Sequence, residues 1–213
     1  MKNFVGSKDA KCELILTEEP KDSMVIITPF KEKKTAFYYN QKIVGFKVNG
    51  KVTIGEDEYV FTDKDTRGIL DWGRGVWTYK NTWYWGAGCG VVDGHEVGFN
   101  IGYGFGDTSA ASENMIFYDG KAHKLENVAF NIPKDKKGKD DYMTPWTFTS
   151  SDGRFECEFT PIIDRHSNAN VVVISSNQHQ VFGKFNGKMI LDNGKEIKLK
   201  DFLAFAEKVQ NKW

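Results

Sequence analysis

The stretch from Asp71 to Trp85 contains the densest group of side chains that could do chemistry. It holds four of the six tryptophans, an acid and an arginine. A carboxylic acid in an apolar pocket has a raised pKa and can donate a proton, and an indole face can stabilise a developing cation. The candidate catalytic residues are therefore Asp71, Arg74 and Glu113. Asp71 and Arg74 can equally form an ion pair that only fixes the local chain.

The same stretch reads as a β-strand with its rings on one face, after a Gly-Arg-Gly bend at 73–75. Side chains alternate along a strand, so one face would carry Trp77, Tyr79, Asn81, Trp83 and Trp85. Such a wall of rings either fills a core or lines a pocket, and the sequence leaves both alternatives open. The residues expected to bind a ligand are Trp72, Trp77, Tyr79, Trp83, Trp85, Asn114 and His179.

Tight-turn dipeptides divide the chain in the manner of an antiparallel β protein. They are Asn49-Gly50, Asp93-Gly94, Asp119-Gly120, Asp152-Gly153 and Asn193-Gly194. From Val97 to Phe105 large residues alternate with glycine or asparagine, which predicts a strand with one nearly bare face. Either the sheet curves sharply there or another group packs against it. Glycines inside strands favour a β-barrel over a sandwich.

One segment near the C-terminus predicts an α-helix. Asp201 can cap its first turn, and the spacing of one buried helical face is followed by Phe202, Phe205, Ala206 and Val209. The expected fold is therefore all-β, an antiparallel barrel with a C-terminal helix packed against it.

Composition and motif spacing argue against several classes of protein. Lys plus Arg equals Asp plus Glu at 29 each, which argues against a nucleic-acid partner. The four histidines lack metal-binding spacing and the glycines at 102–106 lack GxGxxG spacing, so we expect no metal and no cofactor. The three cysteines lack CxxC spacing and are expected to be reduced and buried. Cys157, between two glutamates, would be a poor nucleophile.

The hydrophobic runs of the chain are short. None resembles a signal peptide, and none reaches the ~20 residues that a membrane helix requires. We therefore expect a cytoplasmic protein without an integral membrane span.

The same residues resemble the family catalogued as domain of unknown function 2804. The resemblance covers residues 12–213 and rests on segments in order, at 68–79, 83–88, 98–102, 108–114, 119–124, 145–146, 159–161, 164–165 and 178–183. It implies a lipocalin-like double β-barrel, shared with carotenoid hydratases of the hydroxyneurosporene synthase type, tocopherol cyclases and lipocalin-like Diels–Alderases. Those relatives act on or bind apolar molecules without redox cofactors. The resemblance implies no assigned catalytic residues.

The N-terminal part departs from the family pattern, because typical members have a longer segment there. We expect residues 1–44 to be remnant strands of an N-terminal barrel and residues 45–213 to form the C-terminal lipocalin-like barrel. Exposed strand edges in the remnant would favour self-association or a partner chain.

Three functions stay open at this stage. The favoured one is binding of an apolar small molecule, of isoprenoid, lipid or polyketide type, in the aromatic-lined barrel. The second is a cofactor-independent hydratase, cyclase or lyase that uses a buried carboxylic acid. The third is a structural or partner-binding fragment in which all the rings are core.

Overall fold

The computed structural model describes residues 9–213, and every regular element in this range is a β-strand. The first seven strands are β1 (Ala10–Thr17), β2 (Met24–Phe30), β3 (Lys33–Ile54), β4 (Asp57–Phe61), β5 (Arg67–Val76), β6 (Lys80–Val92) and β7 (His95–Tyr103). The remaining strands are β8 (Met115–Tyr118), β9 (Lys121–Lys124), β10 (Val128–Asn131), β11 (Trp146–Ser150), β12 (Phe155–Val171), β13 (Ile174–Ile190) and β14 (Glu196–Lys212). The all-β antiparallel prediction is confirmed.

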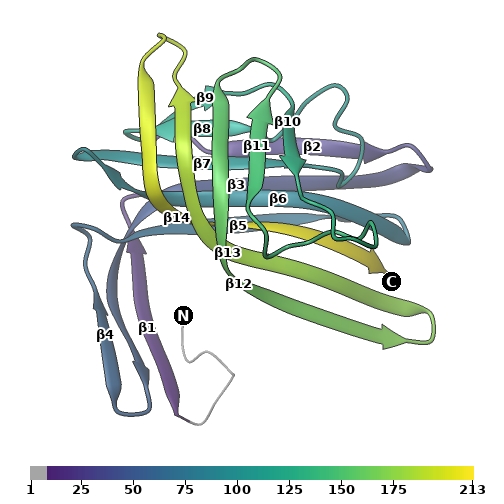
Figure 1. The fold of residues 1–213 in the computed structure, drawn as a ribbon, viewed down its shortest axis with the longest axis horizontal. Helices are drawn as coiled ribbons and strands as arrows, with labels where there is room; N and C mark the ends of the chain where they lie inside the picture. The colour runs from purple at the N-terminus through teal and green to yellow at the C-terminus, as the bar shows by residue number, and fades with distance from the viewer. Residues whose placement is uncertain (1–8) are drawn as a thin grey trace.

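The strands form two antiparallel sheets. The nine-stranded sheet has the order β10-β11-β12-β13-β14-β6-β7-β8-β9. It curls, so that β10 to β13 cross over β6 and β7 (Figure 1). The large apolar core of the molecule lies inside this curl and includes Phe99, Trp146, Phe148, Phe159 and Phe185, all fully buried.

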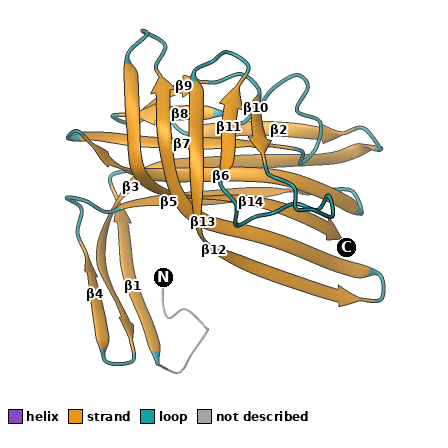
Figure 2. Ribbon diagram, in the orientation of Figure 1, coloured by secondary structure: helices purple, strands orange, loops and turns teal. Residues whose placement is uncertain are grey.

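The five-stranded sheet is organised around the long strand β3. Its first half pairs with β2 on one edge and β5 on the other, and its second half pairs with β1 and β4. The change of partners coincides with Gly45, whose φ of 115° accompanies a register shift between Val44 and Phe46. The second half of β3 projects from the body with β1 and β4 as an arm (Figure 2).

The two sheets meet where β3 approaches β7. Gly98 on β7 has no side chain, and a Cβ placed there would lie 2.7 Å from Cγ1 of Val44. The sequence allowed either sharp curvature or a closely packed group to explain the bare face of β7. At Gly98 the explanation is close packing, by Val44. A small second core, comprising Met24, Ile26, Val44 and Phe117, joins the sheets.

The predicted C-terminal helix is wrong, because Asp201 and the residues around it belong to β14. This strand is hydrogen-bonded to β13 on one side and to β6 on the other. From Ala204 to Val209 every side chain of β14 is buried or half-buried, so both faces of the strand are covered there and the alternation of buried and exposed residues is lost. The apolar spacing at 202, 205, 206 and 209 therefore matched a helix by coincidence, and Asp201 adopts φ 50° beside a bulge rather than a cap.

The aromatic stretch is also divided differently from the prediction. It is not one strand, because β5 ends at Val76 and β6 begins at Lys80. The Gly-Arg-Gly segment is no bend but part of β5, where Gly73 and Gly75 allow close approach to β3. Asn49-Gly50 likewise lies within β3, whereas the other four turn dipeptides do join consecutive strands.

The proposed domain boundary at residue 44 falls inside β3, and residues 1–8 of the predicted remnant lie outside the described part. The division into two barrels stays a prediction. The three cysteines are unpaired, as expected, but only Cys157 is buried. Burial raises the pKa of its thiol to about 12, with a smaller contribution from Glu156.

Candidate functional site

A cavity of about 220 Å³ lies between the two sheets. Its walls come from β2, β3 and β5 on one side, from β6 and β14 on the other, and from the loop between β7 and β8. The lining residues are Ile26, Thr28, Tyr38, Asn40, Lys42, Asp71, Trp77, Trp83, Trp85, Phe105, Thr108, Glu113, Glu207 and Trp213. The cavity thus collects side chains from nearly the whole length of the chain.

Strand alternation explains which side chains reach the cavity. On β3 the even positions Tyr38, Asn40 and Lys42 face it, and on β6 the odd positions Trp83 and Trp85 do. The intervening residues point to the opposite faces of their sheets. Tyr84, for example, packs against the core of the nine-stranded sheet.

One end of the cavity is aromatic, and Phe105 is its centre. Its ring contacts Tyr38 at 4.7 Å, Trp83 at 5.2 Å and Trp77 at 5.9 Å between centroids. Trp77 in turn contacts Trp213 at 6.2 Å. Most of these contacts are edge-to-face or tilted, the arrangements that aromatic rings prefer. They hold the rings in place around the space that they line.

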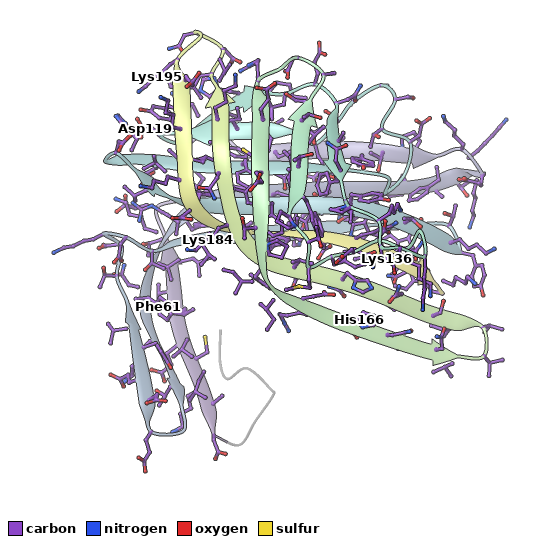
Figure 3. The ribbon with its side chains drawn as sticks, viewed as in Figure 1. Phe61, Asp119, Lys136, His166, Lys184 and Lys195 are labelled. Atoms are coloured by element: carbon purple, nitrogen blue, oxygen red, sulfur yellow. The ribbon has the colours of Figure 1, made fainter. Side chains whose placement is uncertain are left out.

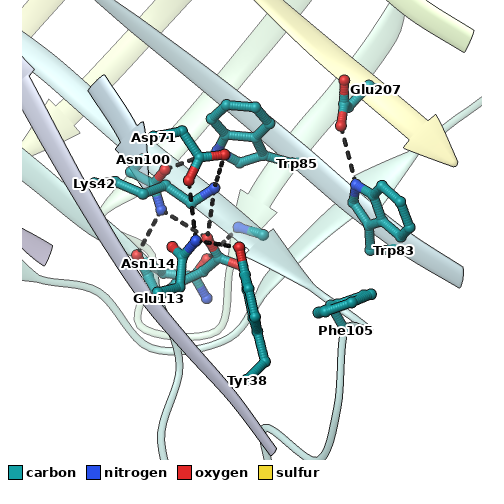
Figure 4. A network of polar contacts seen from close by, with 12 residues as sticks. Tyr38, Lys42, Asp71, Trp83, Trp85, Asn100, Phe105, Glu113, Asn114 and Glu207 are labelled. Atoms are coloured by element: carbon teal, nitrogen blue, oxygen red, sulfur yellow. Dashed lines mark hydrogen bonds and ion pairs between the residues drawn. The ribbon is translucent and has the colours of Figure 1, made fainter. Parts of the chain in front are cut away.

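The other end of the cavity carries a charged cluster centred on Lys42 (Figure 4). The Lys42 ammonium lies 3.3 Å from Oδ2 of Asp71 and 3.7 Å from Oε2 of Glu113. It also sits 3.6 Å above the ring centroid of Trp85, a cation–π contact. The lysine side chain is only 7% exposed, whereas that of Asp71 is 36% exposed. The acids therefore retain more access to the cavity than the lysine does.

Amide side chains fix the two acids of this cluster. Nδ2 of Asn40 donates to Oδ1 of Asp71 at 2.9 Å. Nδ2 of Asn100 donates to Oε2 of Glu113 at 3.0 Å, and its Oδ1 accepts from Nε1 of Trp85 at 2.8 Å. The carboxylates thus have defined positions beside the ring.

Glu207 is a third acid in the cavity, on β14. Its carboxylate is buried and accepts a hydrogen bond from Nε1 of Trp83 and another from Nε2 of Gln180, each at 3.0 Å. Within residues 9–213 it forms no ion pair. Burial raises the pKa of the Glu207 carboxyl despite these two bonds, which lower it. Burial, with the charge of Asp71, also raises the pKa of Tyr38 to about 12.

The structure brings five of the predicted residues to the cavity, namely Asp71, Trp77, Trp83, Trp85 and Glu113. Arg74 does not pair with Asp71, because residues three apart on β5 point to opposite faces. Arg74 lies instead over Trp72 at 6.0 Å, and this ring is half exposed outside the cavity. Tyr79 is outside it too, with its hydroxyl donating to the carbonyl of Val173.

Asn114 and His179 also lie away from the cavity. Asn114 is buried and links two segments, accepting from the amide of Gly102 at 2.7 Å and donating to the carbonyl of Glu126 at 2.9 Å. His179 contacts Asp164 at 2.7 Å and stacks on His166 of the β12–β13 hairpin, which Figure 3 labels. It precedes Gln180 on β13 and therefore faces the other side of the sheet.

Nine cavity residues were not predicted from the sequence, namely Ile26, Thr28, Tyr38, Asn40, Lys42, Phe105, Thr108, Glu207 and Trp213. The alternation of Tyr38, Asn40 and Lys42 on one strand face was a usable signal. Glu207 was hidden by the helix prediction. Nothing in the local pattern of Trp213 points to the cavity.

The described residues offer neither a metal site nor a membrane-spanning helix. No three His, Cys, Asp or Glu side chains within residues 9–213 are arranged to hold a metal ion. In the same range no helix has the length and apolar character needed to cross a membrane.

The two curled antiparallel sheets define a lipocalin-like β fold with a cavity between them. The chain belongs to the family described as domain of unknown function 2804, whose model matches residues 1–213. A search of curated proteins finds no match.

Two solved structures are similar to this chain. The first is an AttH-like protein from Nitrosomonas europaea, with a TM-score of 0.55 and 12% identity, covering 96% of this chain and 62% of that one. This likeness shows the fold alone, and the chain spans less than two thirds of the length of that protein. The second, kievitone hydratase from Nectria haematococca, has a TM-score of 0.45 and 10% identity over 99% of this chain and 69% of that one. That likeness is too remote to support an argument.

Proposed function

We propose that the protein binds a compact, largely apolar small molecule in the cavity between its sheets. The observation that supports this proposal is the aromatic end of the cavity, where Tyr38, Trp77, Trp83, Phe105 and Trp213 surround a space instead of packing it solid. Concave sites with apolar walls and a few convergent polar groups are the usual form of small-molecule sites. The cavity argues against the alternative in which every ring is core.

The size of the cavity restricts the ligand. Pockets for drug-sized molecules are about 300–1,000 Å³, whereas this cavity is about 220 Å³. A molecule with one ring and a short side chain fits this volume better than a long isoprenoid or a fatty acyl chain. Of the ligand types expected from the sequence, we therefore favour compact aromatic or alicyclic compounds.

Ligand binding can be measured from the tryptophans of the cavity. Titration with compact aromatic probes, beginning with 2-phenylethanol, is expected to change indole emission, with calorimetry giving the affinity. Thr108→Trp would place a large ring in the cavity from a loop and abolish binding. Ser109→Trp, exposed and outside this cavity, is the matched control. Unchanged emission and no heat across the whole panel would sink the proposal.

A second function, acid-catalysed hydration, cyclisation or elimination without a cofactor, is favoured by Glu207. Asp71 and Glu113, the acids expected to serve this role, share the Lys42 ammonium and are held in its ion pairs. Glu207 has no such partner in the described chain, is buried among rings, and has a raised pKa. A protonated Glu207 can transfer its proton to a substrate carbon, and Trp83 lies beside the cation that forms.

The proton transfer can be followed with 4-vinylphenol in deuterated water. The deuteron of Glu207 would add to the terminal carbon, water would add its oxygen to the cation, and the proton that water releases would return to the carboxylate. Glu207→Gln is expected to reduce deuterium incorporation at carbon by roughly 100-fold, measured by mass spectrometry. Equal incorporation in both proteins, or none in either, would rule out this role.

A further inference from the structure

The charges at the polar end of the cavity do not balance. Within the cavity lining, two carboxylates, those of Asp71 and Glu113, face the single ammonium of Lys42, which leaves one negative charge in excess. The ammonium of Lys124 also acts on Glu113, but from outside the lining. Glu207, in the same cavity, adds a second one whenever it is ionised. The described cavity lining contains no other cation. The potential in this half-enclosed space is therefore negative, and low-dielectric walls strengthen it.

The hydrogen-bonding groups at this end show the same imbalance. Oδ1 of Asn40 accepts no hydrogen bond from the described residues. The side chain is almost fully buried, so this oxygen is an unpaired acceptor. Asp71 is the most accessible acid of the cluster, since 36% of its side chain is exposed, and its hydrogen-bonding partners within residues 9–213 are Asn40 and Lys42. The most available hydrogen-bonding groups of the charged cluster are thus acceptor oxygens.

The contacts of the Lys42 ammonium show how the groups of this site bind a cation. The Lys42 ammonium is held by two carboxylates and by the face of Trp85 at 3.6 Å. Further ring faces and edges continue from there around Tyr38, Trp83 and Phe105. Aromatic walls with carboxylates at one end are the arrangement that recognises organic ammonium groups. Lys42 offers little to an anionic ligand, because its charge is already shared by two acids.

We infer that the ligand of this cavity is an organic cation, a protonated amine on a compact ring-containing body, whose ammonium group binds at Asp71 and Glu113. This inference rests on the proposed binding function and specifies the ligand class. The ring of the ligand would occupy the aromatic end and its ammonium would supply the missing charge and donors. A carboxylate ligand of the same size would be rejected by the same charges.

Three probes of matched size test the charge preference, namely 2-phenylethylamine, 2-phenylethanol and phenylacetate. At pH 7 the first is a cation, the second is neutral and the third is an anion. We expect the amine to bind roughly tenfold more tightly than the alcohol and the acid to bind most weakly, measured by calorimetry.

Variants connect this preference to the cluster. Asp71→Asn and Glu113→Gln are each expected to remove most of the advantage of the amine, measured in each variant as the ratio of its affinities for the amine and the alcohol. Asp119→Asn, which removes a charge paired with His95 outside the cavity, is the control and should change neither affinity. Two independent variants keep the test valid if one of them fails to fold.

The outcomes separate the inference from the proposed function. Equal affinity for all three probes, or tighter binding of phenylacetate, would overturn the cationic ligand while leaving small-molecule binding intact. Binding of none of the three at millimolar concentration would overturn both. An amine preference that survives both charge-removing variants would also overturn the inference, because it would then arise outside this cluster.

Discussion

At the scale of single residues, the ionisable groups of the cavity differ in whether a group of opposite charge contacts them. Lys42 is held between two acids and an indole face, so its ammonium is stabilised although it is nearly buried. Glu207 has hydrogen bonds but no cation in contact among the described residues, and burial dominates its behaviour. Burial therefore favours the uncharged form of Glu207 in the folded protein by raising the pKa of its carboxyl.

Glu207 should make the stability of the protein fall as pH rises. Its folded-state pKa is raised above its ordinary value of 4.5, so the folded protein holds this proton more tightly than the unfolded chain does. The stabilisation is complete below pH 4.5 and is lost between this value and the folded-state pKa. Glu207→Gln removes the effect, so its free energy of unfolding, relative to the wild type, should rise through this window.

Urea unfolding at a series of pH values measures that difference. Glu196→Gln, an exposed glutamate on the same strand, is the matched control. If both variants follow the same course relative to the wild type, the pH dependence does not come from Glu207.

At the scale of elements, the site depends on how the two sheets approach each other. The cavity lies between them, and they pack closely where Gly98 of β7 meets Val44 of β3. Backbone spacing there also determines how far Lys42, two residues from Val44, stands from Trp85. Packing between sheets is so close that one added methyl group lowers the stability of the fold.

Gly98→Ala should destabilise the protein by about 1–3 kcal/mol, because the new methyl group overlaps with Val44. Val44→Ala alone also destabilises it by leaving a small void. The double variant should lose less than the sum of the two, since the smaller side chain makes room for the methyl group. Chemical denaturation of the four proteins gives the coupling. Additive losses would show that the sheets do not pack at this point.

At the scale of the whole molecule, buried apolar side chains are unevenly distributed between the two sheets. The curled nine-stranded sheet encloses the large aromatic core, whereas most side chains of β1 and β4 in the arm are exposed. Figure 3 labels Phe61 on this arm. Exposed apolar residues on it include Ile15, Ile54, Tyr59 and Val60. Self-association through these strands, like the cytoplasmic location, stays a prediction.

Hydrogen exchange of the backbone amides should reveal this uneven distribution of buried side chains. Amides of β1 and β4 are expected to exchange fastest among the strands, and those of β7, β13 and β14 slowest, because local opening costs least where few apolar groups are buried. Mass spectrometry at two protein concentrations measures this. Slow exchange of the arm at both concentrations would contradict the expectation. Protection that appears only at the higher concentration would support self-association through the arm.

The sequence by itself determined the class of fold and much of the material of the site. Turn dipeptides and short apolar runs predicted antiparallel strands, because these signals act over a few residues. The aromatic stretch also predicted that Trp77, Trp83 and Trp85 lie together. The helix prediction failed because both faces of β14 are covered from Ala204 to Val209, in part by residues distant in sequence such as Trp85, which contacts Phe205.

Only the tertiary structure decided which charges meet. Lys42 reaches Asp71 through the pairing of β3 with β5, and Glu113 arrives on a loop of the other sheet. Glu207 joins Trp83 because β14 pairs with β6. These contacts depend on strand register and on the packing of two sheets, and local periodicity carries no information about either. Side-chain alternation along β5, in contrast, separates Arg74 from Asp71, although the two are close in sequence.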